Sequence, residues 1–293
     1  MVGHKNYGKL YICGTPIGNL KDITLRSLET LNKVDLIAAE DTRHTIKLLN
    51  YFKIKKPLTS YHEHNEKIKS PTILKYLEQG KDVALVSDAG MPGICDPGFY
   101  LIRSALKQDY EIVLIPGVSA LTTALVLSGF EMNHFTFEGF IPKKTKDKKL
   151  FIDSIAYTKR TLIFYDSPYR IQDTLIWFSK KIPNRKMAIN REMTKKYEET
   201  YRGTAVELLE KMDFNKIKGE LTVVLEGSKE DPPEKAKSEE NFPESTEIKK
   251  KMKMYLKKSY YIKDIIFLIN QEYNLPKNWI YKTLLKIKNT GKG

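Results

Sequence analysis

Residues 83–98 read Val-Ala-Leu-Val-Ser-Asp-Ala-Gly-Met-Pro-Gly-Ile-Cys-Asp-Pro-Gly. The four apolar residues Val83 to Val86 predict a buried strand, because a short apolar run bounded by turn residues is typical of parallel sheets. The twelve residues that follow contain three glycines, two prolines and two aspartates. A connection of that length and rigidity is rarely only a turn, so we expect this loop to bind a ligand.

Two further loops of the same kind follow predicted strands. The strand Leu10 to Cys13 leads into Gly14-Thr-Pro-Ile-Gly-Asn19, and the strand Ile112 to Ile115 leads into Pro116-Gly-Val-Ser-Ala120. Each loop by itself is compatible with a tight, capped turn before a helix. However, the carboxyl ends of parallel strands share one edge of a sheet, and ligands of α/β proteins bind there. Three such loops at one edge favour a binding site over three turns.

The loops do not match the common phosphate-binding motifs. Residues 14–19 lack the third glycine of the GxGxxG motif, and no GxxxxGK[ST] motif occurs in the sequence. The dinucleotide-binding interpretation is therefore weak, and the P-loop NTPases are excluded. The glycines and prolines instead bring bare backbone N–H and C=O groups close to a ligand that main-chain atoms would recognise.

Strand-like and helix-like segments alternate through the first 130 residues. Residues 35–39 add a fourth strand, and amphipathic segments predict helices over residues 24–33, 42–51, 71–79, 99–107 and 119–127. This alternation predicts a mostly parallel α/β sheet. A second α/β domain is predicted by five more strand-like segments, at residues 135–141, 161–165, 187–191, 199–202 and 221–225.

The remaining chain divides by composition. Residues 228–245 contain three lysines, six acidic residues and three prolines with little to bury, which is typical of a linker. Residues 246–293 contain twelve lysines against three acidic residues, and three amphipathic segments there predict short helices. We expect domains over residues 1–130 (N-terminal α/β), 131–227 (second α/β) and 246–293 (basic, three helices), with a linker over 228–245. The basic domain could bind nucleic acid or could pack on the second domain.

Length and composition limit the class of protein. The chain has 293 residues, 41% of them hydrophobic, which is enough for buried cores and excludes a disordered protein. The longest apolar run, Ile265 to Ile269, is far shorter than the ~20 residues of a membrane-spanning helix, and residues 1–6 begin no signal sequence. The two cysteines, Cys13 and Cys95, belong to no metal-binding array. We therefore expect a soluble, cytoplasmic protein with free thiols and no membrane association.

The formal net charge of the chain is +14. A charge of this size favours a polyanionic partner such as nucleic acid. The alternative is a proteome in which lysine is the usual surface residue. The position of the charge is more informative than its sum, because residues 246–293 alone carry +9.

Six motifs together resemble one known family. They are Gly14-Thr-Pro-Ile-Gly-Asn19, Ala39-Glu-Asp-Thr-Arg43, Ser60-Tyr-His-Glu-His-Asn65, Val86-Ser-Asp-Ala-Gly90, Pro116-Gly-Val-Ser-Ala120 and Gly219-Glu-Leu-Thr-Val-Val224. In this order they resemble the ribosomal RNA small-subunit methyltransferase I family, which belongs to the tetrapyrrole (corrin/porphyrin) methylase superfamily. The resemblance covers residues 9–227 and extends more loosely to the basic tail. It implies two α/β domains of the tetrapyrrole methylase type with a cofactor cleft between them, plus a small C-terminal helical domain.

The resemblance also implies an activity and a cofactor. A member of this family transfers a methyl group from S-adenosylmethionine to the 2′-hydroxyl of a cytidine ribose in the 16S RNA of the small ribosomal subunit. No metal takes part, and members of the superfamily are commonly homodimers. On the superfamily's pattern the cofactor would contact Pro16, Ile17, Asp88, Gly90, Ile94, Ser119, Ala120, Tyr165, Asp166, Ala205 and Thr222. Asp166 and Tyr169 stand where the ribosomal enzymes often have Glu and His, so we expect no catalytic histidine there.

A ribose hydroxyl is a poor nucleophile at neutral pH and needs a group that accepts its proton. Asp41 and Arg43 directly follow the strand at residues 35–39, and Glu192 lies in the polar run after the strand at residues 187–191. We expect these three residues near the hydroxyl. The alternative for Asp41 is a helix N-cap with Arg43 on the helix surface, and the alternative for Glu192 is a solvated charged loop.

Basic and aromatic residues are candidates for contact with RNA. A basic patch follows the first strand of the second domain and consists of Lys143, Lys144, Lys146, Lys148 and Lys149. Lysine contacts with phosphates would make RNA binding sensitive to salt. An exposed base would also stack on an aromatic ring, for which the candidates are Tyr61, Tyr165 and Tyr169.

His62 and His64 put two imidazoles on one side of an extended segment. With no third ligand in the pattern, we expect no metal site here. The functional interpretation is that His62 contacts RNA or transfers a proton. The alternative is that it has a structural role.

Two other functions stay open. A methylase of a tetrapyrrole-like small molecule would have the same scaffold, but tetrapyrrole-modifying relatives carry Gly-Asp-Pro where this chain has Gly90-Met-Pro92. A nucleic-acid-binding protein without catalysis would use the three-helix tail, and it would leave the three loops unexplained.

Overall fold

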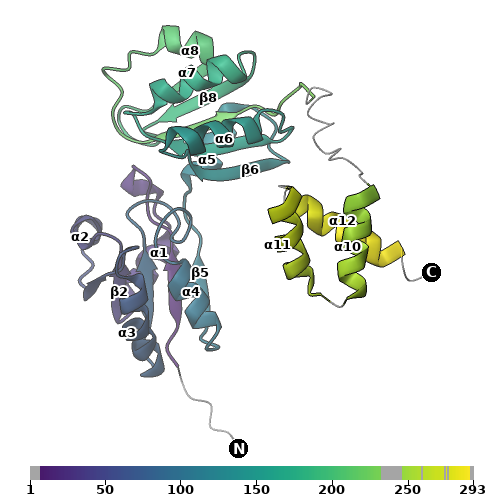
Figure 1. Cartoon of the computed structure of the whole chain (residues 1–293). Helices are drawn as coiled ribbons and strands as arrows, with labels where there is room; N and C mark the ends of the chain where they lie inside the picture. The colour runs from purple at the N-terminus through teal and green to yellow at the C-terminus, as the bar shows by residue number, and fades with distance from the viewer. Residues whose placement is uncertain (1–6, 232–245, 259, 274, 276, 291–293) are drawn as a thin grey trace, which may run out of the picture. The chain divides into compact units, whose positions relative to one another are not determined.

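The structure is a computed structural model, which describes residues 7–231, 246–258, 260–273, 275 and 277–290. The chain forms two compact units, Met1–Lys229 and Glu230–Gly293. Two five-stranded sheets with their helices make up the first unit, and the second unit is helical (Figure 1). The fold class predicted from the sequence, α/β with a small helical C-terminal region, is confirmed.

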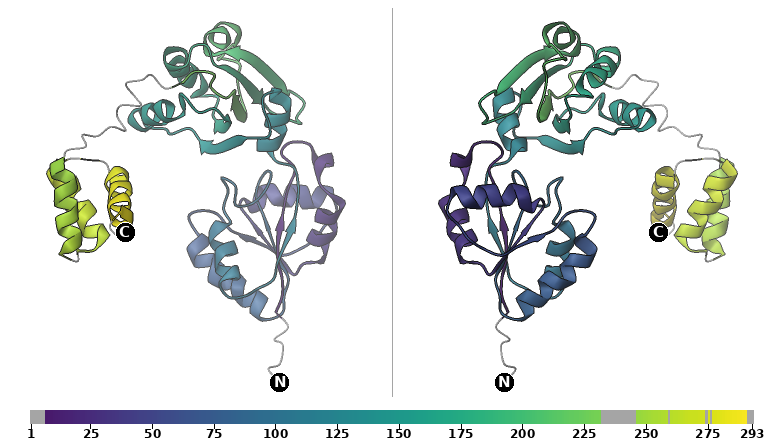
Figure 2. Two further views of the ribbon diagram at one scale, coloured as in Figure 1. Left: turned by 90° about the vertical axis from the view of Figure 1, so that its right-hand side faces the viewer. Right: turned by 90° about the vertical axis from the view of Figure 1, so that its left-hand side faces the viewer.

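The first sheet is parallel throughout, with the strand order β3-β2-β4-β1-β5. Its strands are β1 (Leu10–Cys13), β2 (Leu36–Ala39), β3 (Leu58–Ser60), β4 (Val83–Val86) and β5 (Ile112–Ile115). Its helical segments are η1 (Leu20–Asp22), α1 (Leu25–Lys33), α2 (Thr42–Tyr51), α3 (Glu66–Glu78) and α4 (Phe99–Leu106). Figure 2 shows helices on both sides of this sheet.

Strand β4 is apolar at every position because both faces of the sheet are covered. Val83 and Leu85 belong to the core that includes side chains of α3 and α4. Ala84 and Val86 belong to the core that includes side chains of α1 and α2. Since successive side chains of a strand point to opposite faces, four apolar residues in a row supply both cores.

Two elements of the first sheet differ from the prediction. The sequence does not predict β3, because this edge strand is only three residues long and half-buried, and it lacks a clear apolar signal. Helix α3 begins at Glu66 and contains Pro71, whereas the pattern predicts a helix that starts at residue 71. Proline favours the first turn of a helix, which explains the wrong start.

The second sheet is mixed, with the strand order β6-β7-β10-β8-β9. Its strands are β6 (Phe135–Phe140), β7 (Thr161–Asp166), β8 (Lys186–Arg191), β9 (Glu199–Thr204) and β10 (Leu221–Leu225). Only β6 and β7 run parallel, and every other neighbouring pair is antiparallel. One face packs against α6 (Thr145–Ile155), α7 (Ile171–Lys181) and α8 (Ala205–Lys211).

The other face of the second sheet is covered by α5 (Ala120–Ser128), the helix that follows β5 of the first sheet. Ala124 and Leu125 of α5 share a core with Ile163 of β7 and Val224 of β10. The Nη2 group of Arg202 in β9 also donates a hydrogen bond to the carbonyl of Leu127. Helix α5 thus fastens the second sheet to the first.

The helical unit contains α10 (Thr246–Lys257), α11 (Ile262–Tyr273) and α12 (Lys277–Thr290). These correspond to the three predicted amphipathic segments. Their apolar sides meet in one core, whose buried members are Ile248, Met252, Ile265, Ile269, Leu275, Ile280 and Leu284. In the part of the chain that the structure describes, no helix has both the length and the apolar character needed to cross a membrane.

One buried arginine, Arg185, lies directly before β8 and joins the end of α6 to the end of β10. Arg185 is 7% exposed, and its guanidinium donates to the carbonyls of Ile155, Ala156, Thr158 and Glu226 over 2.5 to 3.1 Å. In Arg185→Met these partly or fully buried carbonyls lose the charged guanidinium donor, so we expect the free energy of unfolding to fall by about 3 kcal/mol. Urea titration followed by circular dichroism measures the loss. The exposed neighbour supplies the control, because Lys186→Met should change stability by less than about 0.5 kcal/mol.

Candidate active site

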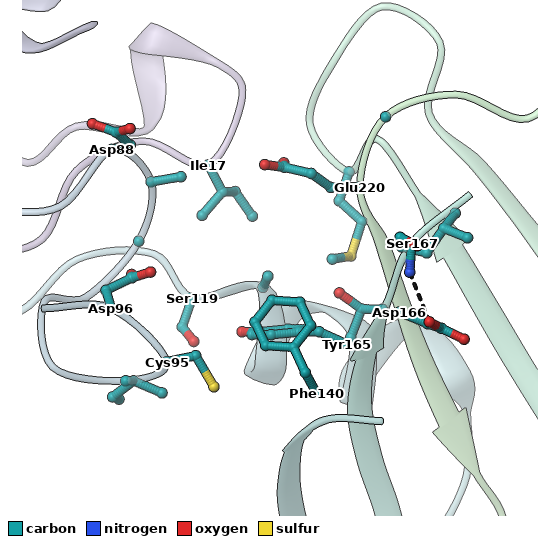
Figure 3. Close-up of a pocket in the computed structure, with 18 of the residues that line it drawn as sticks. Ile17, Asp88, Cys95, Asp96, Ser119, Phe140, Tyr165, Asp166, Ser167 and Glu220 are labelled. Carbon is teal, nitrogen blue, oxygen red and sulfur yellow. Dashed lines mark hydrogen bonds between the residues drawn. The ribbon is translucent and has the colours of Figure 1, made fainter. Parts of the chain in front are cut away.

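A cavity of about 410 Å³ lies between the carboxyl edge of the first sheet and one edge of the second (Figure 3). From the first sheet it is lined by Ile17, Glu40, Asp88, Ala89, Gly90, Met91, Ile94, Cys95, Asp96, Ser119 and Ala120. From the second sheet it is lined by Phe140, Tyr165, Asp166, Ser167, Pro168, Met193, Gly219, Glu220, Leu221 and Thr222. All three glycine- and proline-rich loops therefore contribute to one cavity.

Backbone contacts hold the three loops together. Thr15 and Gly90 exchange two backbone hydrogen bonds, of 2.9 and 3.1 Å, and the Thr15 hydroxyl donates to the carbonyl of Ser87 at 3.1 Å. The third loop approaches even more closely, since a Cβ atom on Gly117 would lie 2.9 Å from the Cα of Gly14. Glycine is therefore required where these loops cross beside the cavity.

Ser119 is the N-cap residue of α5, and its side chain makes no capping hydrogen bond. Its hydroxyl lies instead at the cavity, as Figure 3 shows. The first N–H groups of a helix lack partners within the helix and carry partial positive charge. The start of α5 therefore offers hydrogen-bond donors and a free hydroxyl to a ligand.

The second sheet contributes an aromatic side to the cavity. The rings of Phe140 and Tyr165 lie edge to face with centroids 5.4 Å apart. Burial raises the pKa of Tyr165 to about 12, so its hydroxyl stays protonated. A flat, apolar ligand group would pack against these rings.

Asp166 follows Tyr165, but its carboxylate is turned into the protein. The carboxylate accepts hydrogen bonds from the Thr174 hydroxyl at 2.7 Å and from the Ser167 N–H at 2.8 Å, and Arg170 lies 3.2 Å away. Burial raises the pKa of Asp166 despite these partners. Its side chain thus fixes the turn after β7, and the cavity is bordered by its backbone and by Ser167.

Carboxylates gather on the side of the first sheet. The N–H of Asp88 donates to Glu40 at 3.2 Å, and Asp88 accepts from the N–H of Asp41 at 3.1 Å. Burial raises the pKa of Asp96 to about 7, and the nearby Glu40 carboxylate adds to the rise. Burial likewise raises the pKa of Glu40. Among the residues that the structure describes, no lysine, arginine or histidine lines this cavity, so it favours a positively charged ligand.

The sequence matches the family of Tetrapyrrole (Corrin/Porphyrin) Methylases over residues 9–209. Several curated relatives carry the name ribosomal RNA small subunit methyltransferase I. The protein of Halalkalibacterium halodurans is 42% identical, covering 94% of this chain and 93% of its own length. That of Bacillus subtilis is 39% identical over 95% of this chain and 94% of its own.

The chain belongs to the ribosomal RNA small subunit methyltransferase I family of tetrapyrrole methylases. A shorter member, from Thermotoga maritima, is 48% identical over 75% of this chain and 99% of its own length. The recognition made from the six motifs is confirmed.

Solved structures of the wider fold agree. Diphthine synthase aligns with a TM-score of 0.60 at 16% identity, covering 75% of this chain and 90% of its own. A cobalt precorrin-4 methyltransferase aligns with a TM-score of 0.57 at 18% identity, covering 77% and 98%. At such identities the likeness shows the fold alone.

S-adenosylmethionine is the cofactor of this methyltransferase family, and the cavity fits it. A volume of about 410 Å³ is within the range of small-molecule sites. The acidic side suits the sulfonium and ammonium groups of the cofactor, the rings of Phe140 and Tyr165 suit its adenine, and the start of α5 suits its carboxylate.

All but two of the residues expected to contact the cofactor line this cavity. Pro16 lines an adjoining cavity instead. Ala205 is the first residue of α8 and is fully buried in the core of the second sheet, away from either cavity.

The three residues expected near the acceptor hydroxyl lie beside the cavity and do not line it. Asp41 is the N-cap of α2, and hydrogen bonds from Arg43 lower its pKa to about 2. Glu192 accepts from the Lys195 ammonium at 2.9 Å and from the Glu220 N–H at 3.1 Å. Burial would raise the pKa of Glu192, but these hydrogen bonds lower it.

The residues expected to contact RNA occupy different environments. Lys143, Lys144 and Lys146 are exposed at the start of α6. Lys148 is only 3% exposed and is paired with Asp173 at 2.5 Å, so its assignment to the basic patch is wrong. It lies on the buried side of α6, one turn beyond Lys144.

The histidine and tyrosine candidates also differ in exposure. His62 is half-buried, and its ring lies 3.0 Å from the amide nitrogen of Asn65. Tyr61 is fully buried with its hydroxyl 3.0 Å from that of Ser70, so it cannot stack on a base and that expectation is wrong. Tyr169 is 97% exposed.

Sequence reasoning missed several residues of the cavity, among them Glu40, Asp96, Phe140, Met193 and Glu220. Glu220 was hard to find because β10 is antiparallel to both of its neighbours. The amino end of β10 therefore lies beside the carboxyl ends of β7 and β8. A prediction based only on loops that follow strands does not include Glu220, which precedes its strand. Asp96 carried a usable signal, since it is the second aspartate of the loop at residues 87–98.

Ser119 and Thr204 allow a paired test of this site. Thr204 is the N-cap of α8 and forms a complete capping box with Glu207, whereas the Ser119 hydroxyl caps nothing. We expect Ser119→Ala to weaken S-adenosylmethionine binding about fivefold with little change in stability, because one hydrogen bond to the ligand is lost. Thr204→Ala should lower the free energy of unfolding by about 1 kcal/mol and leave cofactor affinity unchanged.

Isothermal titration with the cofactor and urea unfolding of both variants measure these effects. Equal affinity of Ser119→Ala and wild type would contradict the contact at the start of α5.

Proposed function

We propose that this protein is a methyltransferase that transfers a methyl group from S-adenosylmethionine to the 2′-hydroxyl of a cytidine ribose in the RNA of the small ribosomal subunit. The reaction type is supported by the acidic cavity to which all three glycine- and proline-rich loops contribute, and which has no basic side chain among its described lining residues. The substrate follows from the family, whose members are named for ribosomal RNA of the small subunit.

Methyl transfer of this kind is an in-line displacement, and the bound cofactor supplies a methyl group that is already activated by positive sulfur. Positioning of the two reactants can therefore provide much of the rate. The protein's own tasks are to hold the cofactor, to orient the hydroxyl and to accept its proton.

Asp96 is our candidate for the proton acceptor. Its carboxyl group lines the cavity, and burial raises its pKa to about 7, so the carboxylate is a stronger base than an ordinary aspartate and is still formed near neutral pH. The lowered pKa values of Asp41 and Glu192 make these carboxylates weaker bases. We assign them positioning roles: the N–H of Asp41 orients Asp88, and Glu192 holds Glu220 and Lys195.

The pH dependence tests the role of Asp96. Because only the deprotonated carboxylate accepts a proton, kcat of the wild type should rise with pH through about 7 and then level off. We expect Asp96→Asn to lower kcat by roughly 10²- to 10⁴-fold and to remove this inflection, with cofactor affinity retained.

The matched control for this variant is Asp109→Asn, which changes an exposed aspartate in a turn. It should keep the wild-type rate and pH profile. An inflection near pH 7 that persists in Asp96→Asn would assign the proton to another group.

The activity itself is tested with labelled cofactor. Small ribosomal subunits from a strain that lacks this protein are incubated with tritiated S-adenosylmethionine and the enzyme, and the RNA is hydrolysed in alkali. We expect label in alkali-resistant dinucleotides, because alkaline cleavage needs a free 2′-hydroxyl. Label that enters a heme or corrin precursor and not RNA would favour the alternative, a methylase of a tetrapyrrole-like small molecule.

We also propose that the enzyme works in the cytoplasm as a homodimer. Support for a dimer comes from large apolar side chains that the first unit leaves exposed, including Leu114 of β5 and Val126 of α5, which are 56% and 65% exposed. Sedimentation equilibrium of the full chain should give twice the mass of 33.9 kDa. A concentration-independent mass of one chain would contradict the dimer.

A further inference from the structure

A second cavity, of about 380 Å³, adjoins the first. The two share the lining residues Ile17, Asp88, Ala89 and Glu220, so they meet at these residues. The rest of the second cavity is formed largely by the first loop and by one side of α2. The proposed cofactor contacts and the proposed proton acceptor include no residue on this side of α2.

The two cavities differ in charge. Apart from Asp166, whose carboxylate is turned into the protein, the first cavity is lined by Glu40, Asp88, Asp96 and Glu220 and by no basic residue among those that the structure describes. The second has two acidic residues, both of which also line the first, and adds His44, Lys47 and Lys195. The two lysines balance these two carboxylates, so the second cavity is much less acidic than the first. A ligand phosphate therefore depends on a lysine that no carboxylate already neutralises.

The basic residues of the second cavity are not equally available. Lys195 is paired with Glu192 at 2.9 Å and with Glu220 at 3.1 Å, and His44 lies 4.0 Å from Asp88. Lys47 is exposed and has no hydrogen-bond or ion-pair partner among the residues that the structure describes. Lys47 is therefore the ammonium group that is free to bind a phosphate.

An aromatic ring accompanies this lysine. Tyr51 lies four residues after Lys47 at the end of α2, and residues at this spacing are neighbours on one face of a helix. Its side chain is 60% exposed and lines the same cavity. Exposed aromatic rings are the surfaces on which unpaired RNA bases stack.

Methyl transfer requires an acceptor site that adjoins the cofactor cavity, because in an in-line displacement the nucleophile must contact the methyl carbon directly. Ile17, Asp88, Ala89 and Glu220 line both cavities, so the two meet there. The ribose of a nucleotide in the second cavity would lie at this junction.

We propose that the second cavity binds the target nucleotide of a single-stranded RNA segment, with its base stacked on Tyr51 and a flanking phosphate bound by Lys47. This inference rests on the proposed function, since it names the place where the RNA of that reaction is held. The nucleotide site on α2 would be separate from the residues that bind the cofactor.

Steady-state methyl transfer by the full chain to unmethylated small subunits tests the site with Lys47→Gln and Tyr51→Leu. We expect Lys47→Gln to raise KM for subunits about 3- to 10-fold and to reduce the salt dependence of kcat/KM by about one ion. Tyr51→Leu should raise KM about 5- to 100-fold, as expected when one base loses its stacking partner. The affinity for S-adenosylmethionine should stay within about twofold of wild type in both variants.

The control variants are Lys75→Gln and Tyr157→Leu, which change exposed residues that line neither cavity. They should keep the wild-type KM and salt dependence. Wild-type values for both α2 variants would overturn the nucleotide site, and so would a loss of cofactor affinity that accounts for the whole effect. If the wild type methylates a ribosomal protein and not RNA, the proposed function fails in the unmutated enzyme, before any variant is compared.

Discussion

The site depends on one helix that belongs to both halves of the first unit. Helix α5 continues from β5 of the first sheet, and its residues Ala124 and Leu125 pack against β7 and β10 of the second. The helix has no charged residue and buries Ala124, Leu125 and Ser128, so one side of it packs on the second sheet. Because α5 starts at the carboxyl edge of one sheet and lies under the other, the two sheets enclose a cavity at Ser119 and Ala120.

Enclosure changes the chemistry of the side chains at that edge. Burial is the largest cause of the raised pKa values of Asp96, Glu40 and Tyr165. Burial disfavours the charged form of an acid, and in Asp96 the neighbouring carboxylate of Glu40 disfavours it further. The same residues on an open sheet edge would be ordinary acids. The raised pKa of Asp96 is thus a consequence of its burial in this arrangement.

The sequence predicted most of the first sheet because its strands are short apolar runs followed by glycine and proline. The same rule located the loops around Gly90 and Ser119, which line the cavity. It could not locate Glu220, which precedes its strand, because strand direction in a mixed sheet is set by long-range pairing. Nor could it separate Lys148 from its neighbours, since the burial of one lysine depends on the partner that Asp173 of α7 provides.

The paired cavities suggest how one fold can keep a constant cofactor and vary its acceptor. The cofactor cavity lies beside loops whose close backbone contacts, such as that of Gly117 with Gly14, leave no room for a side chain at the crossing. The adjoining cavity is built from side chains on the surface of α2, where His44, Lys47 and Tyr51 can change without disturbing a strand. In the proposed nucleotide site, substitutions on this helix would alter the charge and shape presented to the acceptor, while Ile17, Asp88 and Glu220, which line both cavities, would be unchanged. Acceptor specificity on this scaffold is therefore expected to depend on α2 more than on the three loops.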